Sequence, residues 1–339
     1  MRIQSLSFLR LLSVFLISGC LALAASVAQA KPLTINLGYA SAAKGNAYSV
    51  LADEFEKLVE EYSNGEIDIK VRCCTQLATE DEAFKGMQLG SIDMYLITSN
   101  NVSPHYPLMD AFILPYIFQS KEHAYKILEG EVGKKFARDF FKKTGVHLLT
   151  YGYVGVRDFY NSARPIRTLA DMKGMKVRVP KNQVMLETYK AFGAAPIPLA
   201  WAETPTALQT GTVSGGDNGV TFIKSQKFYE VCNNLAITEH FAYFNPLFAS
   251  NRIMKKMTDK QRDIIHRAAE EAGQRHKEIM DNKIAAVKGF LKEEGKMTVT
   301  QPERAAFIKA AVKVQEDFIR EKNNQELEDL VKAIRAAAN

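Results

Sequence analysis

The sequence predicts an α/β protein of two domains, and three observations support this. The chain has 339 residues, more than the roughly 150 that one domain typically holds. Alternating apolar segments are separated by segments of helical periodicity, the pattern of a mostly parallel sheet with helices on its faces. This series stops and begins again near residue 175, which indicates a second open sheet.

In the first half, strands are expected where apolar residues alternate and helices where they recur at helical spacing. The expected strands are residues 33–39, 66–72, 92–98 and 146–154. The expected helices are residues 46–62, 80–89 and 121–143. Ser63-Asn64-Gly65 and Gly90 follow the first two of these helices and are typical helix ends.

The second half repeats the order of strand, helix and strand. Strands are expected at 175–179 and 195–200, with a short strand entering a glycine-rich loop at 211–218. Helices are expected at 183–192 and 202–210. This arrangement predicts a second sheet of its own.

The C-terminal part is almost entirely helical. Thr258-x-x-Gln261 is a capping-box pattern, and helical periodicity then continues to Glu294. We expect one long helix bridging both domains, or two helices with a kink near Gly273. Thr300-x-x-Glu303 predicts the start of the last helical segment, with Pro302 in its first turn.

The N-terminus has the pattern of a secretory signal peptide. Arg2 and Arg10 precede an uncharged segment that ends in Ala28-Gln29-Ala30, so cleavage is expected after Ala30. Two alternatives are an uncleaved anchor and a lipobox at Ile17-Ser18-Gly19-Cys20 that would leave Cys20 lipidated. All three export the protein, and we expect a periplasmic location.

Export bears on the remaining cysteines, Cys73, Cys74 and Cys232. An oxidising compartment allows one disulfide and one free thiol. Neighbours on a strand point to opposite faces, so at most one of Cys73 and Cys74 can conveniently reach Cys232. Cys74–Cys232 is the candidate pairing, and three buried, unpaired cysteines are an equal alternative.

Composition and missing motifs exclude several functions. The chain is 47% hydrophobic and 24% charged with a net charge of +6, and its basic residues form no concentrated nucleic-acid stripe. The six histidines form no metal-spaced pair, and GxSxG, GxGxxG and phosphate-loop motifs are missing. We expect no catalysis, no cofactor, no metal and no nucleic-acid partner.

Polar residues at strand ends are the candidate binding residues, because ligands of open α/β sheets bind beyond the carboxyl ends of the strands. Arg178 precedes Pro180 near the end of one strand, and Arg157 follows another. A guanidinium fork matches a carboxylate or sulfonate. The other candidates, each of which can equally be a packing, capping or turn residue, are Trp201, Asn218, Asn46, Glu80 and Asn100.

The central part of the chain closely resembles the DctP-type extracytoplasmic solute-binding proteins of TRAP transporters. The resemblance rests on VGVRDFYNSARPIRTLADMKGMKVRVP and AFGAAPIPLAWAETPTALQTGTVSGGDN. It extends through QLATEDEAFKGMQLGSIDM upstream and QKFYEV downstream. It implies that Arg178 binds the ligand carboxylate and that Arg157, Asn218 and Trp201 line the site.

Several positions depart from the family pattern. Trp201 stands where the family usually has Phe, and Cys73-Cys74 replaces a Tyr-Pro-like pair. In the loop before Asn218, Ser214 and Asp217 replace the usual Asp and Glu.

The resemblance also implies a two-domain periplasmic-binding-protein fold with hinge strands and a long domain-spanning helix. Domain I would comprise 31–153 and about 244–283, and domain II 154–243 and about 284–339, after a signal peptide at 1–30. The implied function is capture of a small organic acid for the small and large membrane subunits of a TRAP permease. Ligands of the family include C4-dicarboxylates, keto acids, sugar acids and sialic acid, and small sulfonates offer the same oxyanion. Trp201 in place of Phe favours a compact ligand, so we expect a C2–C4 carboxylate or a sulfonate such as isethionate. The alternatives are an extracytoplasmic sensor and a secreted lyase or isomerase.

Overall fold

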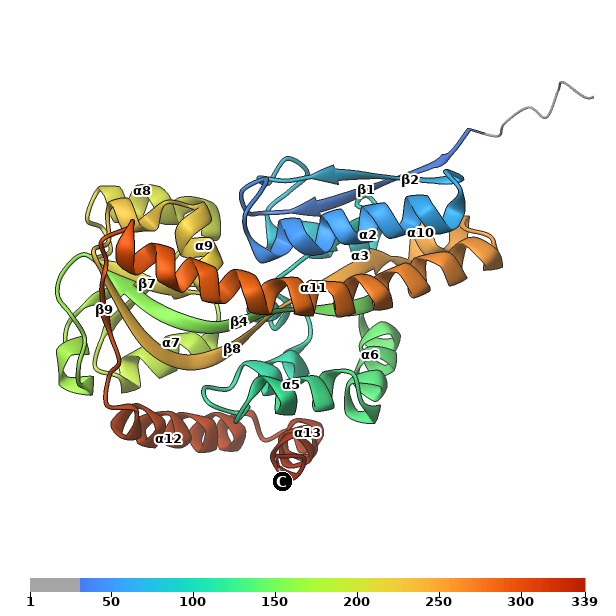
Figure 1. Ribbon diagram of the computed structural model, residues 1–339. Helices are drawn as coiled ribbons and strands as arrows, with labels where there is room; N and C mark the ends of the chain where they lie inside the picture. The colour runs from blue at the N-terminus through green and yellow to red at the C-terminus, as the bar shows by residue number, and fades with distance from the viewer. Residues whose placement is uncertain (1–30, 339) are drawn as a thin grey trace, which may run out of the picture. The chain divides into compact units, whose positions relative to one another are not determined.

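The structure is a computed structural model, and it describes residues 31–338. The expected signal peptide, its cleavage site and Cys20 lie outside the described residues. From Thr34 onward the chain forms one compact unit, in which strands and helices alternate (Figure 1). No helix in the described part is long and apolar enough to cross a membrane.

Nine strands are hydrogen-bonded into one sheet among the described residues. Its order is β2-β1-β3-β8-β4-β7-β5-β6, with β9 paired to β8. The strands are β1 (Leu33–Tyr39), β2 (Ile67–Arg72), β3 (Met94–Leu96), β4 (Val146–Asn161), β5 (Lys176–Val179), β6 (Ala195–Pro198), β7 (Gly215–Asn218), β8 (Asn234–Ser250) and β9 (Thr298–Thr300).

Two long antiparallel strands, β4 and β8, join the two sheets predicted from sequence. Their pairing runs from Val146 opposite Ser250 to Asn161 opposite Asn234. One end of the pair carries β1–β3 and the other carries β5–β7, so the fold has the expected α/β class with crossing strands. The domain boundaries given above remain a prediction.

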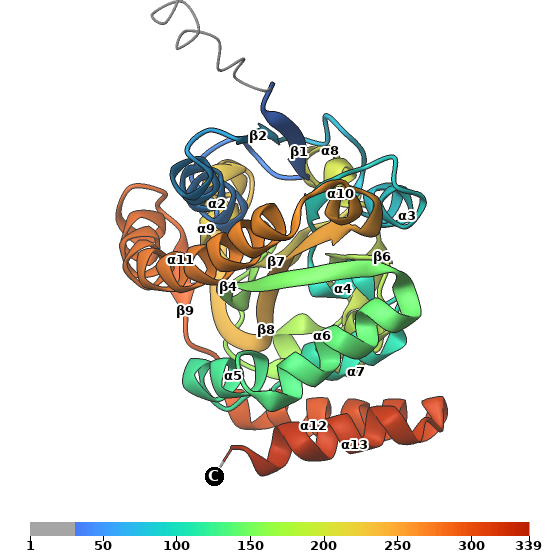
Figure 2. The same cartoon turned by 90° about the vertical axis from the view of Figure 1, so that its right-hand side faces the viewer.

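Helices cover the sheet, and α11 (Asp259–Glu293) is the longest at 35 residues (Figure 2). The expected Thr258/Gln261 capping box starts it, and it continues through Gly273 as one helix. It packs against α2, β4 and α9, elements from both halves of the chain. The other α-helices are α2 (Ala47–Ser63), α3 (Glu80–Leu89), α4 (Ser99–Val102), α5 (Lys121–Leu128), α6 (Glu131–Thr144), α7 (Gln183–Ala191), α8 (Thr204–Gln209), α9 (Val220–Ser225), α10 (Asn251–Lys256), α12 (Arg304–Lys322) and α13 (Gln325–Ala336).

Buried apolar side chains form a large cluster and a smaller one. The large cluster joins side chains such as Phe84, Phe140 and Phe248 with Tyr189 and Phe307. Because these residues come from both halves of the chain, one continuous core supports the binding residues described below.

The expected helix at 121–143 is two helices. The chain turns between α5 and α6 at Gly130, where a Cβ atom would lie 2.4 Å from the carbonyl oxygen of Lys126. Only glycine fits so close an approach of two backbone segments. Helical periodicity continues across this turn, and for that reason the sequence predicted one helix over 121–143 instead of two.

The capping box expected at Thr300 is wrong. Thr300 ends β9, and its hydroxyl donates to the carbonyl of Ile166 over 2.7 Å. Helix α12 begins only at Arg304, so Pro302 lies before it. The short strand expected within 211–218 is present as β7 (Gly215–Asn218), and its glycines lie in the strand rather than in a loop after it. A Cβ at Gly215 would lie 2.3 Å from the carbonyl oxygen of Tyr160 on β4, so glycine permits this close pairing.

The cysteine prediction is also wrong. Cys73 and Cys74 are bonded to each other, and Cys232 is a buried free thiol. Cys232 lies in the smaller apolar cluster with residues such as Phe228 and Leu291. Because the sulfur of Cys74 is bonded to Cys73, the Cys74–Cys232 bridge does not form.

Candidate ligand-binding cavity

Six of the seven predicted binding residues line one small cavity. It contains about 310 Å³ of space between atoms, part of it open to solvent. The six are Arg157, Arg178, Asn218, Trp201, Glu80 and Asn100. They come from strand ends and helix starts far apart in the sequence, so the fold brings them together.

Asn46 is the exception and does not line the cavity. It caps α2: its side-chain oxygen accepts from the backbone N–H groups of Tyr48 (3.0 Å) and Ser49 (3.2 Å). Its amide nitrogen donates to the carbonyl of Ala42 over 2.7 Å. Asn46 therefore acts on the site through Tyr48, whose ring does line the cavity.

Arg178, on β5, is 3% exposed. Its Nε and Nη2 atoms donate to the carbonyl of Leu199 over 3.1 and 2.8 Å, which orients the guanidinium. No carboxylate in the described part of the chain pairs with it. Burial, together with the nearby Arg157 guanidinium, lowers its pKa. A buried cation without a counter-ion favours binding of an anion.

Arg157, on β4, already has a carboxylate partner. Its Nε donates to Oδ2 of Asp217 over 2.7 Å, and its Nη2 contacts Oδ1 (3.1 Å) and the backbone carbonyl (2.8 Å). Burial alone would raise the pKa of Asp217, but Arg157 and His240 hold it well below its usual range. The pair uses Nε and Nη2, so Nη1 makes no bond to Asp217.

A buried histidine supports this ion pair. His240 Nε2 lies 3.1 Å from Oδ2 of Asp217, and Nδ1 lies 2.8 Å from the hydroxyl of Thr238. Burial lowers the pKa of His240, which favours the neutral ring. We assign the proton to Nε2, so that the ring donates to Asp217 and accepts from Thr238.

Sequence analysis missed His240 and Tyr243, over whose ring the Arg157 guanidinium lies at 4.5 Å. Both are on β8, a segment in which the sequence analysis predicted no strand. Nearly every residue of β8 is buried, so period-two alternation is missing. Only the long run of apolar and aromatic residues could have indicated it.

Asn218 lies at the carboxyl end of β7 and is 1% exposed. Its side-chain oxygen accepts from the N–H of Gly219 over 2.8 Å, which leaves the amide nitrogen as the donor for a ligand. The two glycines before it allow β7 to lie against β4, with Asn218 opposite Asp158.

Glu80 has a different role from the one expected, since its carboxylate is already saturated. It accepts from the hydroxyls of Tyr48 and Thr98, the N–H of Thr98 and the amide of Asn101. Four donors fill the acceptor sites of a carboxylate. Glu80 therefore holds Tyr48, Thr98 and Asn101 in the cavity wall rather than serving as a free ligand anchor.

Aromatic rings complete the wall. Trp201 packs edge-on against Phe222 and Phe228, with ring centroids 6.1 and 5.7 Å apart. The Arg178 guanidinium lies 5.6 Å from the Trp201 ring centroid. Trp201 thus combines the two roles that its sequence position allowed, packing anchor and cavity wall.

A larger groove of about 1210 Å³, part of it open to solvent, adjoins the cavity. The two share Glu80, Asn101, Arg178, Pro180 and Trp201. The groove is also bordered by Thr75 and Thr79 of the segment between β2 and α3. Arg178 is therefore reached from outside through this groove.

Residues 38–322 match the model of the bacterial extracellular solute-binding proteins of family 7, DctP. The chain belongs to this family. A solute-binding protein of Roseobacter denitrificans is 31% identical over 86% of this chain and 88% of its own length. The sialic acid-binding periplasmic protein SiaP of Vibrio cholerae is 31% identical over 80% and 83%, respectively.

Solved structures agree. The sugar acid binding protein DctPAm of Advenella mimigardefordensis, in complex with galactonate, matches with a TM-score of 0.85 at 26% identity, over 91% of this chain and 99% of its own. A TRAP periplasmic solute-binding protein of Sulfurospirillum deleyianum, with bound succinate, gives 0.82 at 27%, over 90% and 99%. The family is extracytoplasmic, binds small organic acids and works with membrane permease components. This member is accordingly a transport binding protein and not an enzyme.

Proposed function

We propose that this protein captures a C2–C4 organic acid anion in the periplasm and delivers it to the small and large membrane subunits of a TRAP permease. The anion is a carboxylate or a sulfonate, such as a dicarboxylate or isethionate. Cleavage of the signal peptide after Ala30 releases the protein into the periplasm. One observation carries the proposal: Arg178 is a buried guanidinium with no carboxylate partner among the described residues.

In the bound state, the acid group pairs with the free edge of Arg178, and Arg157 Nη1 and the Asn218 amide donate to it. A planar guanidinium matches the two oxygens of a carboxylate or two of the three oxygens of a sulfonate. Because both guanidiniums are buried, these contacts are stronger than they would be at the surface. The acid supplies the negative charge that Arg178 lacks.

Cavity size supports a compact ligand. The inner cavity of about 310 Å³ is walled by Tyr48, Trp201, Phe222 and Tyr243. Among the related structures, one contains the four-carbon acid succinate and another, from a Polaromonas species, contains D-erythronate. Trp201, where the family usually has Phe, occupies additional space beside Arg178.

The proposal is tested by calorimetric titration of the exported protein with succinate, D-erythronate, D-galactonate, isethionate and taurine. One charge-assisted hydrogen bond contributes about 1.5–3 kcal/mol, so Arg178→Ala should weaken binding at least about tenfold. Arg138→Ala, at an exposed position on α6, is the matched control and should bind like the wild type. Unchanged affinity in a folded Arg178→Ala protein would overturn the proposed site.

The same titration tests the ligand class. Tighter binding of D-galactonate than of every smaller acid would replace the C2–C4 class with sugar acids. A sensor would bind the same acids, so transport is tested separately. Deleting the gene for either permease subunit should abolish uptake of the bound acid by cells, and continued uptake would argue for the sensor.

A further inference from the structure

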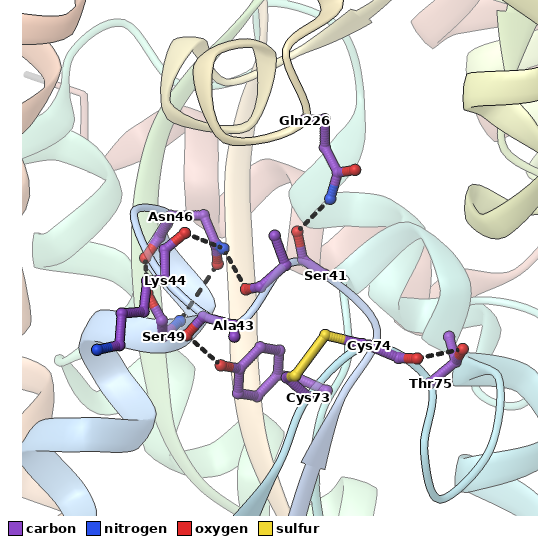
Figure 3. Close-up of a disulfide and its surroundings, with 11 residues drawn as sticks. Ser41, Ala43, Lys44, Asn46, Ser49, Cys73, Cys74, Thr75 and Gln226 are labelled. Carbon is purple, nitrogen blue, oxygen red and sulfur yellow. Dashed lines mark hydrogen bonds between the residues drawn. A yellow bond between two sulfur atoms is a disulfide. The ribbon is translucent and has the colours of Figure 1, made fainter.

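The bond between Cys73 and Cys74 lies at the rim of the ligand groove, next to the groove residue Thr75. Cys74 is exposed and Cys73 is half-buried. The next residue, Thr75, borders the groove that leads to Arg178 and Trp201. Figure 3 shows the disulfide with Ser41 above it and with Thr75 hydrogen-bonded to the carbonyl of Cys74. None of the roles assigned above uses this disulfide.

The disulfide lies in a turn that its sequence disfavours. The N–H of Gln76 donates to the carbonyl of Cys73 over 3.0 Å, which closes a turn with Cys74 and Thr75 at its centre. Both central residues have positive φ, 61° and 59°. Turns with two such residues strongly favour Asn-Gly, and a β-branched threonine at positive φ is an outlier. Something other than local preference must hold this turn.

The disulfide supplies that restraint. Cross-linking stabilises a fold mainly by closing a long loop in the unfolded chain, and adjacent residues enclose no such loop. The bond therefore contributes little to global stability. It does close a small ring that includes the peptide bond between the two cysteines, which restricts the backbone where the turn needs it.

Hydrogen bonds connect the turn to the end of β1 and, through Ser41, to the second half of the chain. The N–H groups of Cys74 and Thr75 donate to the carbonyls of Ser41 (3.0 Å) and Tyr39 (3.3 Å), at the end of β1. The Ser41 hydroxyl accepts from the amide of Gln226, 3.3 Å away at the end of α9. This contact joins the first half of the chain to the second, as Figure 3 shows.

We propose that Cys73–Cys74 is a redox-modification site, at which reduction by a dithiol releases the turn and weakens acid binding. The proposal rests on the proposed function only for its effect on affinity. The reductant class is a dithiol, either a small molecule or a dithiol oxidoreductase. Its action changes the order of the rim and leaves the buried anion contacts in place.

The chemistry balances. One thiolate of the dithiol attacks the Sγ of Cys74, which forms a mixed disulfide and releases Cys73 as a thiolate. The second thiolate of the reductant then attacks the other reductant sulfur, which is bonded to Cys74, and releases Cys74 as a thiolate. Two electrons pass to the protein, the dithiol becomes a disulfide, and its two protons end on Cys73 and Cys74.

Cys232 provides an internal contrast. It is 1% exposed, and burial raises the pKa of its thiol to about 12. Its thiolate is therefore scarce and shielded at neutral pH. In the native protein, any redox response should come from Cys73 and Cys74.

The first test needs no ligand. The exported protein is treated with dithiothreitol and its thiols are alkylated under native conditions. Mass spectrometry should find label on Cys73 and Cys74 and not on Cys232. Amide hydrogen exchange at residues 73–79 should become at least about tenfold faster on reduction, because exchange reports local opening. Either free Cys73 and Cys74 thiols in the protein as isolated, or unchanged exchange after reduction, would overturn the proposal.

The second test measures affinity for succinate and isethionate with and without dithiothreitol. Losing one neutral hydrogen bond at the rim should make the dissociation constant about two- to tenfold larger. Cys73→Ser/Cys74→Ser should reproduce the reduced affinity, and Cys232→Ala should respond like the wild type. Equal affinities in the two redox states would contradict the proposed effect on binding.

A repaired turn separates the disulfide from the turn that it holds. Combining Cys73→Ser with Cys74→Asn and Thr75→Gly places Asn-Gly at the centre of the turn. This variant should bind like the oxidised protein and ignore dithiothreitol. If neither acid binds the oxidised wild type, the proposed ligand class fails, and hydrogen exchange still decides whether the disulfide holds the turn.

Discussion

Nε of Arg157 lies 2.7 Å from Oδ2 of Asp217, and Asp217 is completely buried. Arg178 lines the same cavity, donates to the Leu199 carbonyl and lies beside the Trp201 ring, and no carboxylate of residues 31–338 forms an ion pair with it. The two arginines are therefore not equivalent. Arg157 is held in place by a permanent counter-ion, and Arg178 receives its counter-ion with the ligand.

Breaking the Arg157–Asp217 pair should destabilise the fold. Asp217→Asn leaves a buried guanidinium unpaired, at a cost of about 3–5 kcal/mol. At roughly 2–4 °C per kcal/mol, the melting temperature should fall by about 10 °C. Asp81→Asn, which removes an exposed partner of Lys85, should change it by less than about 2 °C. Equal small shifts in both variants would contradict the role of the ion pair.

Trp201 should report ligand binding directly. It is the only tryptophan in the chain and lies in the cavity wall beside Arg178. A charge arriving next to an indole changes its emission, so titration with a binding acid should shift the fluorescence of the wild type. Trp201→Phe should lose this signal and still bind the acid in calorimetry. A ligand that binds without changing the emission would place it away from this wall.

Asp158 should make stability depend on pH. Burial raises the pKa of its carboxyl to about 7, despite the opposing charge of Lys288 and the N–H of Glu239. Its folded-state pKa lies above the unfolded value, so the folded protein holds more protons between about pH 4 and pH 7. The contribution of Asp158 to the unfolding free energy therefore falls as pH rises through this window.

Asp158→Asn removes the pH-dependent contribution of Asp158 to the unfolding free energy and keeps the side-chain oxygen that accepts from the N–H of Glu239. Chemical denaturation at pH 4.5, 5.5 and 6.5 measures the difference. The wild type should lose up to about 1.4 kcal/mol per pH unit relative to the variant. Parallel pH profiles for the two proteins would mean that Asp158 is ionised throughout.

Two glycines of α11 should respond oppositely to alanine. A Cβ at Gly289 has no atom within 4 Å, so Gly289→Ala should stabilise the protein by about 1 kcal/mol through helix propensity. A Cβ at Gly273 would lie 2.5 Å from the Thr150 hydroxyl on β4. Gly273→Ala should lose this gain to the clash. A higher melting temperature in both variants would show that Thr150 can move aside.

Local patterns determined much of this protein. The end of α3 at Gly90, the capping box of α11 and the position of Arg178 before Pro180 each depend on residues close in sequence, and each was predicted. The candidate binding residues could be identified because strand ends are marked by polar residues after apolar alternation. Family resemblance strengthened the assignment of Arg178, Arg157 and Asn218.

Tertiary structure decided what depends on distant partners. Strand β8 is buried along most of its length and so has no alternation to detect, yet its pairing with β4 places His240 and Tyr243 against Arg157. Saturation of Glu80 depends on donors from two other segments of the chain. Pairing of Cys73 with Cys74 depends on a turn that local preference disfavours. Hydrogen-bond partners and counter-ions are set by contacts between segments remote in sequence, and only the folded chain brings those segments together.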